Sequence, residues 1–124
     1  HRLHRPPDFC RQKMLDAGVI LAVATDCNPG TAWTESMQFA IALSCRSMKL
    51  TPAQAIAAST INAAYAIRRE DRVGSLEVGK QADMLLLTVP DYRQLGYRFG
   101  TNLVKKVVKR GRVYSVDVGY YQTA

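Results

Sequence analysis

The segment from Gly18 to Thr31 constrains the fold of this 124-residue chain more than any other. It begins with an apolar run, Val19–Ala24, and then changes abruptly to Asp26, Asn28 and a Pro29-Gly30 pair. A short, continuous apolar run predicts a strand buried on both faces, which is typical of parallel sheets. In α/β folds, and in (β/α) barrels above all, polar side chains at the C-terminal ends of such strands carry the chemistry. Asp26 is therefore the first candidate for a functional residue.

Composition limits the classes of protein to which the chain can belong. Its length allows at most one domain of ordinary size, and 48% hydrophobic with 22% charged residues is typical of a soluble globular protein. No apolar run approaches the length of a membrane span, and no signal peptide opens the chain. Three cysteines without paired spacing favour neither a disulfide framework nor a zinc site. We therefore expect a cytoplasmic location, and we expect this chain without an initiator Met to be cut from a longer protein.

Apolar spacing and capping residues predict helices in the first part of the chain. Each has apolar or small residues at intervals of three and four, which places them along one face. Thr51-Pro52-Ala53-Gln54 has the pattern of a capping box with proline in the first turn. The predicted helices span Pro7–Ala17, Glu35–Ser47 with Thr34 as N-cap, and Ala53–Arg68 after the capping box.

From Arg72 the pattern changes to period-two segments and glycine turns. Asp83–Thr88 predicts a buried strand, and Asn102–Tyr114 predicts a hairpin with its turn at Arg110-Gly111. A boundary near Arg69–Ser75 separates a helical half from a small β half.

The predicted hairpin is basic, and the whole chain carries a formal charge of +7. Clustered lysine and arginine near an aromatic residue are one sign of a nucleic-acid-binding module. Interleaved valines instead favour the solvated face of a hairpin, and we prefer this interpretation. The basic residues are Lys105, Lys106, Lys109, Arg110 and Arg112.

Two motifs connect the chain to a known superfamily. The stretch Gly74-Ser-Leu-Glu-Val-Gly-Lys-Gln-Ala-Asp-Met-Leu85 resembles the segment by which amidohydrolase-superfamily enzymes re-enter their small β-sandwich domain. Thr25-Asp26, after an apolar run, is similar to the end of the eighth barrel strand of those enzymes. The resemblance implies an α/β fold: residues 1–71 form the C-terminal end of a (β/α)8 TIM barrel, and residues 72–124 form the C-terminal part of a β-sandwich domain.

Further motifs narrow the resemblance to the imidazolonepropionase family. They are Ala24-Thr-Asp-Cys-Asn-Pro-Gly30, Leu50-Thr-Pro52, Thr60-Ile-Asn-Ala-Ala64, Asp71-Arg-Val-Gly-Ser75, Tyr97-Arg-Phe-Gly100 and Leu103-Val-Lys-Lys-Val-Val-Lys-Arg-Gly111. The resemblance implies hydrolysis of the carbon-nitrogen bond of 4-imidazolone-5-propanoate to N-formimidoyl-L-glutamate, a step of histidine degradation, by a metal-activated water. Another cyclic amidase or aminohydrolase of the superfamily is the alternative. The family's His-x-His pair has no counterpart here, so we expect the isolated chain to be inactive.

Asp26 matches a position that, in this family, binds one divalent metal, zinc or iron. The resemblance implies that Asp26 is a metal ligand and a proton acceptor, because a carboxylate supplies a hard anionic ligand and a base. From the residues alone, an aspartate that caps the following turn explains the position equally well.

Asn28, Gly30 and Thr31 match family positions that contact the substrate. Amide and hydroxyl groups can donate and accept hydrogen bonds, and glycine permits close approach of the backbone. A simple Asn-Pro-Gly β-turn is the alternative.

The remaining candidates receive structural interpretations. We expect Cys27 to be a small buried filler and Asp83 to be a paired structural carboxylate. Arg98 has two interpretations, a bidentate contact to a substrate carboxylate and a stacked structural arginine, and it is left out of the candidate site. The expected partner is a small-molecule substrate, with no nucleic acid and no membrane. A homodimer of the full-length protein is left open.

Overall fold

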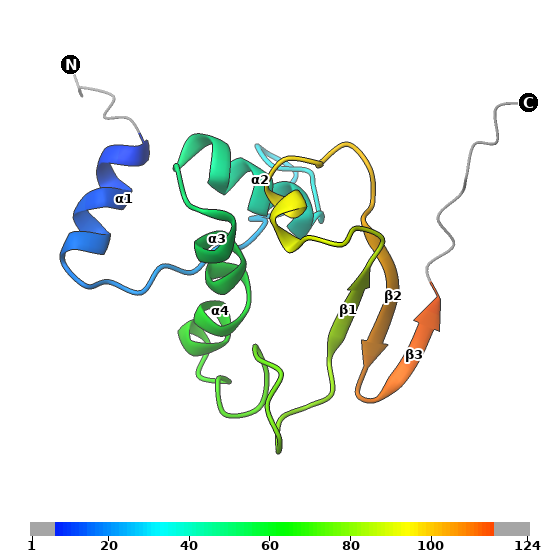
Figure 1. Ribbon diagram of the computed structural model, residues 1–124. Coiled ribbons are helices and arrows are strands. Elements are labelled where there is room, and N and C mark those ends of the chain that lie inside the picture. The colour runs from blue at the N-terminus through cyan, green and yellow to red at the C-terminus, as the bar shows by residue number, and fades with distance from the viewer. Residues whose placement is uncertain (1–6, 116–124) are drawn as a thin grey trace, which may run out of the picture.

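The computed structural model describes residues 7–115, with helices in the first part and an antiparallel sheet in the last (Figure 1). None of the described helices is long and apolar enough to cross a membrane. The prediction of mixed helices and strands is confirmed, and the described sheet is antiparallel, in agreement with the predicted hairpin. The parallel sheet expected around Val19–Thr25 is not present among residues 7–115. In chain order the elements are α1 (Pro7–Asp16), α2 (Met37–Ser47), α3 (Pro52–Ser59), α4 (Ile61–Ala66), β1 (Met84–Leu87), the 3-10 helix η1 (Tyr92–Gly96), β2 (Val104–Lys109) and β3 (Arg112–Ser115).

Helix α3 begins as predicted. The Thr51 hydroxyl accepts a hydrogen bond from the Gln54 amide at 3.2 Å, and the Gln54 carbonyl oxygen accepts one from the Thr51 amide at 3.0 Å. These two bonds complete a capping box, and Pro52 follows in the first turn.

The single helix predicted over Ala53–Arg68 is wrong, because the backbone breaks at Thr60. Thr60 has φ −124° and ψ −94°, outside the helical region. The hydroxyls of Ser59 and Thr60 donate to the carbonyls of Ala55 and Ile56, at 2.8 and 2.7 Å. Such bonds from serine and threonine to the preceding turn often bend helices.

Helix α2 begins two residues later than predicted. Ser36 is its N-cap, and the Ser36 hydroxyl accepts from the Phe39 amide at 3.2 Å. Thr34, the predicted cap, instead accepts from the Ser36 amide at 3.2 Å. Either hydroxyl is a suitable cap, and the sequence pattern did not separate them.

A buried cluster lies where α2, α3 and η1 meet. Its buried members are Ile41 of α2, Leu50 of the connection between α2 and α3, and Ala55 of α3. Apolar side chains from neighbouring elements pack around these three, namely Leu21, Cys45, Met48, Ile56 and Leu95.

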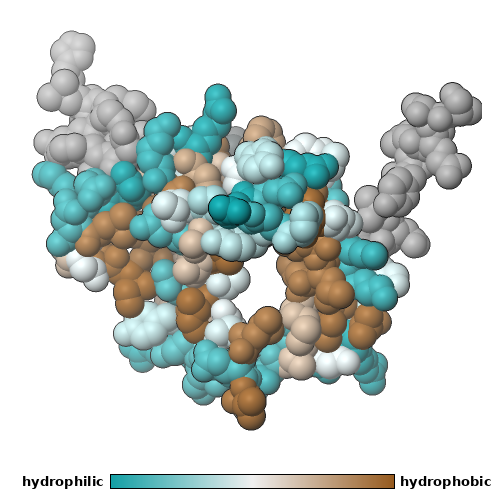
Figure 2. Space-filling model, in the orientation of Figure 1, coloured by the Kyte–Doolittle hydropathy of each residue, from teal (hydrophilic) through white to brown (hydrophobic). Residues whose placement is uncertain are grey.

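The sheet has the order β1-β2-β3, and β2-β3 is the predicted hairpin. Arg110 and Gly111 form its turn with φ values of 50° and 78°, so that prediction is confirmed. The prediction that Asp83–Thr88 is a buried strand is only half right. The strand forms as β1, but Leu85 is 58% exposed. Figure 2 shows the resulting apolar surface on the sheet. No second layer of described residues covers it.

The prediction of a buried strand over Val19–Thr25 is wrong for this structure. The segment is not hydrogen-bonded as a strand, and Ile20 is 57% exposed. Leu21, Val23 and Thr25 are half-buried, while Ala22 and Ala24 are exposed. This alternation is that of an extended backbone with one covered side. No neighbouring strand among residues 7–115 offers it a ladder.

Candidate functional site

Residues 26–32 form a tight loop after the extended segment. Asp26 has a positive φ of 51°, which turns the chain at the end of the segment. Asn28 pairs with Ala32 in an isolated bridge, with the Asn28 amide 3.1 Å from the Ala32 carbonyl. The loop therefore returns on itself within a few residues.

The Asn28 side chain organises this loop. Its oxygen accepts from the backbone amides of Gly30 and Thr31, both at 2.9 Å, and from the Thr31 hydroxyl at 3.4 Å. Its nitrogen donates to the Asp26 carbonyl at 2.6 Å. The β-turn interpretation of Asn-Pro-Gly thus describes the observed geometry, since the side chain bonds within its own turn. One N–H of the Asn28 amide group has no partner among the described residues.

The Asp26 carboxylate is different from its neighbours. Its side chain is exposed, and no described residue forms a hydrogen bond or ion pair with it. The turn is closed by the Asp26 carbonyl and the Asn28 amide, so the carboxylate itself does not cap it. A free carboxylate is the type of oxygen ligand that a divalent zinc or iron ion accepts.

The described residues bring no further metal ligands to Asp26. No group of three or more histidine, cysteine, aspartate or glutamate side chains in residues 7–115 is arranged to hold a metal ion. Asp26 fits the role of one ligand, and the described part of the chain does not supply a complete set.

An open cavity of about 760 Å³ lies beside the loop. Thr25, Thr31 and Trp33 line it from the loop side, and apolar side chains of α2, among them Phe39 and Leu43, line it from the other. Trp33 is 82% exposed, an unusual state for so large an apolar side chain. Sequence reasoning did not single out Trp33, although a tryptophan two residues after the candidate loop was a visible signal.

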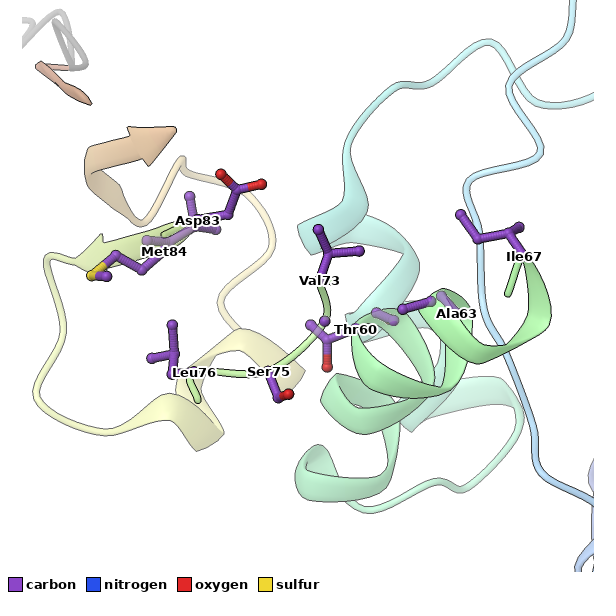
Figure 3. A pocket seen from close by; sticks show the side chains of 12 residues that line it. Thr60, Ala63, Ile67, Val73, Ser75, Leu76, Asp83 and Met84 are labelled. Carbon is purple, nitrogen blue, oxygen red and sulfur yellow. The ribbon is translucent and has the colours of Figure 1, made fainter. Parts of the chain in front are cut away.

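A separate cavity of about 600 Å³ lies between α3–α4 and β1 (Figures 2 and 3). Its walls are mostly apolar, and Thr60, Ser75 and Asp83 add polar groups. None of the four predicted site residues lines this cavity. It is therefore distinct from the Asp26 loop.

Asp83 is a paired carboxylate, as predicted. It accepts hydrogen bonds from Lys109 Nζ at 2.5 Å, the Arg110 amide at 2.8 Å and Gln81 Nε2 at 2.6 Å. The Lys109 bond, followed by the Arg110 amide, lowers the pKa of Asp83 to about 2. Two of its partners belong to the β2-β3 turn, so Asp83 fastens that turn to the start of β1.

Two minor predictions have different outcomes. The prediction of Cys27 as a buried filler is wrong, because its side chain is exposed in the loop. Arg98 donates to the Gln94 side chain at 3.3 Å, a contact within the same local segment.

Asn62 is a polar residue on α4 that the sequence analysis names only as part of the motif Thr60-Ile-Asn-Ala-Ala64. Its side-chain nitrogen donates to the Leu21 carbonyl at 2.9 Å, and the Val23 amide donates to the Ala58 carbonyl at 2.9 Å. Helices α3 and α4 therefore hold the segment that leads to Asp26. An asparagine within an alanine-rich predicted helix was the signal available in the sequence.

The comparisons with known proteins place this geometry in a family. A profile of the Amidohydrolase family matches residues 11–114. The imidazolonepropionase of Herpetosiphon aurantiacus is 58% identical over 102 residues, and that of a Geobacillus species is 52% identical over 102 residues. Each match covers 82% of this chain and 24% of the relative, so the chain spans about a quarter of the length of these relatives.

Solved structures give the same result. An amidohydrolase from Thermotoga maritima superposes with a TM-score of 0.65 at 26% identity, over 86% of this chain and 26% of that chain. Molinate hydrolase superposes with a TM-score of 0.63 at 25% identity, over 92% of this chain and 27% of that chain. Because the family profile covers most of the residues, from 11 to 114, the chain belongs to the amidohydrolase family.

Proposed function

We propose that this chain is part of a metal-dependent hydrolase with imidazolonepropionase activity, and that the Asp26 loop forms part of its active site. One observation carries the proposal. The exposed Asp26 carboxylate has no described partner, and it ends an extended segment in a chain 58% identical to an imidazolonepropionase over 102 residues. A carboxylate without a structural partner is available for a ligand.

The proposed fold extends the observed one. Residues 1–71 form the C-terminal end of a (β/α)8 barrel, and residues 72–124 form part of a β-sandwich domain. The superposition on the Thermotoga maritima amidohydrolase supports an amidohydrolase fold, and the division at residue 71 is part of the proposal. In such a barrel, neighbouring strands cover the extended Val19–Thr25 segment, and Asp26 stands at its C-terminal end.

The substrate of the proposed reaction is 4-imidazolone-5-propanoate. Water adds to the ring carbonyl carbon, the adjacent carbon-nitrogen bond breaks, and N-formimidoyl-L-glutamate is released. A divalent zinc or iron ion, if bound by Asp26 and further ligands, would supply Lewis acidity toward the carbonyl and a more acidic water. Asp26 provides one ligand to that ion, accepts a proton from the attacking water, and returns a proton to the departing nitrogen.

The rest of the loop orients the substrate. One N–H of the Asn28 side chain has no partner among residues 7–115, and the Thr31 hydroxyl can accept as well as donate. Gly30 leaves space around the Asn28 side chain, because a Cβ at residue 30 would lie 3.3 Å from the Asn28 side-chain oxygen. The open cavity beside Thr31 and Trp33 gives room for a small cyclic substrate.

A hybrid enzyme tests the proposal. In it, this chain replaces the stretch of the Herpetosiphon aurantiacus imidazolonepropionase to which it is similar. We expect ring opening of 4-imidazolone-5-propanoate, with a kcat/KM within roughly tenfold of the parent enzyme. A folded, metal-loaded hybrid that opens a different cyclic amide but not this substrate would contradict the proposed imidazolonepropionase activity and would favour another amidohydrolase activity.

A further inference from the structure

The extended segment before Asp26 is held by few bonds. Between residues 20 and 27, two hydrogen bonds reach other elements in the part of the chain that the structure describes: Asn62 to the Leu21 carbonyl, and the Val23 amide to the Ala58 carbonyl. We call this pair the Leu21–Val23 anchor. Both bonds are 2.9 Å long and fall on alternate residues of the segment.

The break at Thr60 makes the anchor possible. In an uninterrupted helix, the Ala58 carbonyl would accept from the amide of residue 62. With α3 ending at Ser59, the Ala58 carbonyl is instead available to the Val23 amide. Helix α4 starts anew at Ile61, and from there the Asn62 side chain reaches the Leu21 carbonyl. The irregular helix junction thus supplies both an acceptor and a donor to one segment.

The covered side of the segment agrees with the anchor. Leu21, Val23 and Thr25 are half-buried, whereas Ala22, Ala24 and Asp26 are exposed. The anchor fixes which residues of the segment face helices α3 and α4. In an extended chain, Asp26 lies roughly 10 Å beyond Val23, so its position depends on the anchor. A shift of the segment by one residue would exchange its two sides.

We infer that Asn62 is a positioning residue for Asp26: through the Leu21–Val23 anchor it sets the place of the metal-binding carboxylate. This inference rests on the proposed role of Asp26 as a metal ligand. Groups that orient metal ligands typically change metal affinity by about 10- to 100-fold when they are removed. A side chain that only stabilised the fold would not produce this change.

The experiment uses the hybrid enzyme with Asn62→Asp and Asn62→Ala. The aspartate keeps the shape of the side chain and removes the donor, so it remains informative if the alanine variant folds poorly. Asn102→Asp is the matched control, because it makes the same change at an exposed asparagine whose side-chain oxygen accepts from the Val104 amide, away from the anchor and from the helix break. The readouts are metal affinity by chelator competition, amide hydrogen exchange of residues 19–26 in metal-free protein, and kcat with KM.

We expect both Asn62 variants to lose at least tenfold in metal affinity, to exchange faster over residues 19–26, and to lose kcat with little change in KM. The Asn102→Asp control should stay within twofold of the unsubstituted hybrid in metal affinity. Unchanged metal affinity in folded Asn62→Asp protein would overturn the inference.

The outcomes separate this inference from the proposed function. A hybrid that binds metal with the expected Asn62 dependence but does not open 4-imidazolone-5-propanoate overturns the proposed substrate alone. A folded hybrid that binds no metal overturns the ligand role of Asp26, and the inference about Asn62 with it.

Discussion

Gly74 shows how closely the turn after α4 packs on the helices. Its φ is +96°, and a Cβ at this position would lie 2.8 Å from the Ala64 Cβ and 2.9 Å from the Ile61 Cα. Gly79 has nearly the same φ, +92°, but no atom lies within 4 Å of its virtual Cβ. The two glycines therefore separate the cost of backbone conformation from the cost of a clash.

Replacing each glycine by alanine in the hybrid enzyme should give different losses of stability. Gly79→Ala should lower the free energy of unfolding by about 1–2 kcal/mol, the cost of a positive φ. Gly74→Ala should lose about 1–3 kcal/mol more, because helix backbone cannot move aside easily. Chemical denaturation measures both values. Equal losses in the two variants would show that α4 does not pack against Gly74.

Asp83 should make stability depend on acid pH. Its pKa falls from 3.8 to about 2 in the folded chain, chiefly through Lys109. A lowered pKa stabilises the fold above the unfolded value, and that contribution disappears as pH falls from about 4 to about 2. The difference in unfolding midpoint between the unsubstituted hybrid and Asp83→Asn should therefore shrink over this interval. A difference that stays constant from pH 5 to pH 2 would contradict this assignment.

Individual residues were partly predictable. The pairing of Asp83 followed from its place at the start of an apolar strand, where an unpaired carboxylate is costly. The exposure of Cys27 was not predictable, because the loop direction depends on the positive φ of Asp26.

At the scale of elements, Gln38 joins the helices to the β-sheet part. From α2, its side-chain nitrogen donates to the carbonyls of Arg98 and Thr101, at 2.6 and 2.9 Å. Its oxygen accepts from the amide of Leu103 at 3.1 Å, just before β2. Leu103 itself is almost fully buried. One glutamine therefore satisfies three backbone groups of the loop that leads into the sheet.

Gln38→Ala should lower the free energy of unfolding of the hybrid by about 1–3 kcal/mol, since each bond contributes about 1 kcal/mol. Amide exchange of residues 98–103 should rise at the same time. Gln12→Ala is the control: its single bond to Asp16 lies on an exposed face of α1, and its loss should cost under about 0.5 kcal/mol. If Gln38→Ala and Gln12→Ala are equally stable, the three hydrogen bonds of Gln38 do not contribute to the free energy of unfolding.

Local signals predicted the elements better than their arrangement. The capping box at Thr51 and the Arg110-Gly111 turn depend on residues close in sequence, and both were found. The bonds of Asn62 and Gln38 depend on partners far along the chain, which no local pattern reveals. The predicted strand over Val19–Thr25 did not form for a related reason, because a strand requires a hydrogen-bonded neighbour.

At the scale of the whole molecule, the isolated chain exposes surface that a stable domain would cover. Its described core contains few large buried side chains, while β1 presents Met84, Leu85 and Leu86 to solvent at the edge of the sheet. An exposed apolar edge strand promotes association between chains. We expect the 124-residue chain alone to self-associate.

Sedimentation velocity over a range of concentrations tests this expectation. The weight-average mass should exceed that of the monomer and should fall in Leu85→Lys, which places a charge on the β1 edge. Arg98→Lys, a conservative change at an exposed site away from β1, should leave the association unchanged. A monomeric chain with a cooperative thermal transition would show that the exposed apolar surface of β1 does not cause self-association.

The proposed role of the Asp26 loop rests both on the family membership and on the exposed Asp26 carboxylate. Two isosteric substitutions test this role most directly. Asp26→Asn and Asp83→Asn each convert one carboxylate to an amide, the first in the proposed site and the second at the start of β1, where it bonds Lys109 and Arg110. Metal content and ring opening of 4-imidazolone-5-propanoate are measured for both in the hybrid enzyme. We predict that Asp26→Asn loses bound metal and at least roughly 100-fold in turnover, more than the loss of an orienting group would cause, while Asp83→Asn retains both. Normal metal content and turnover in Asp26→Asn would contradict the assignment of this loop to the active site.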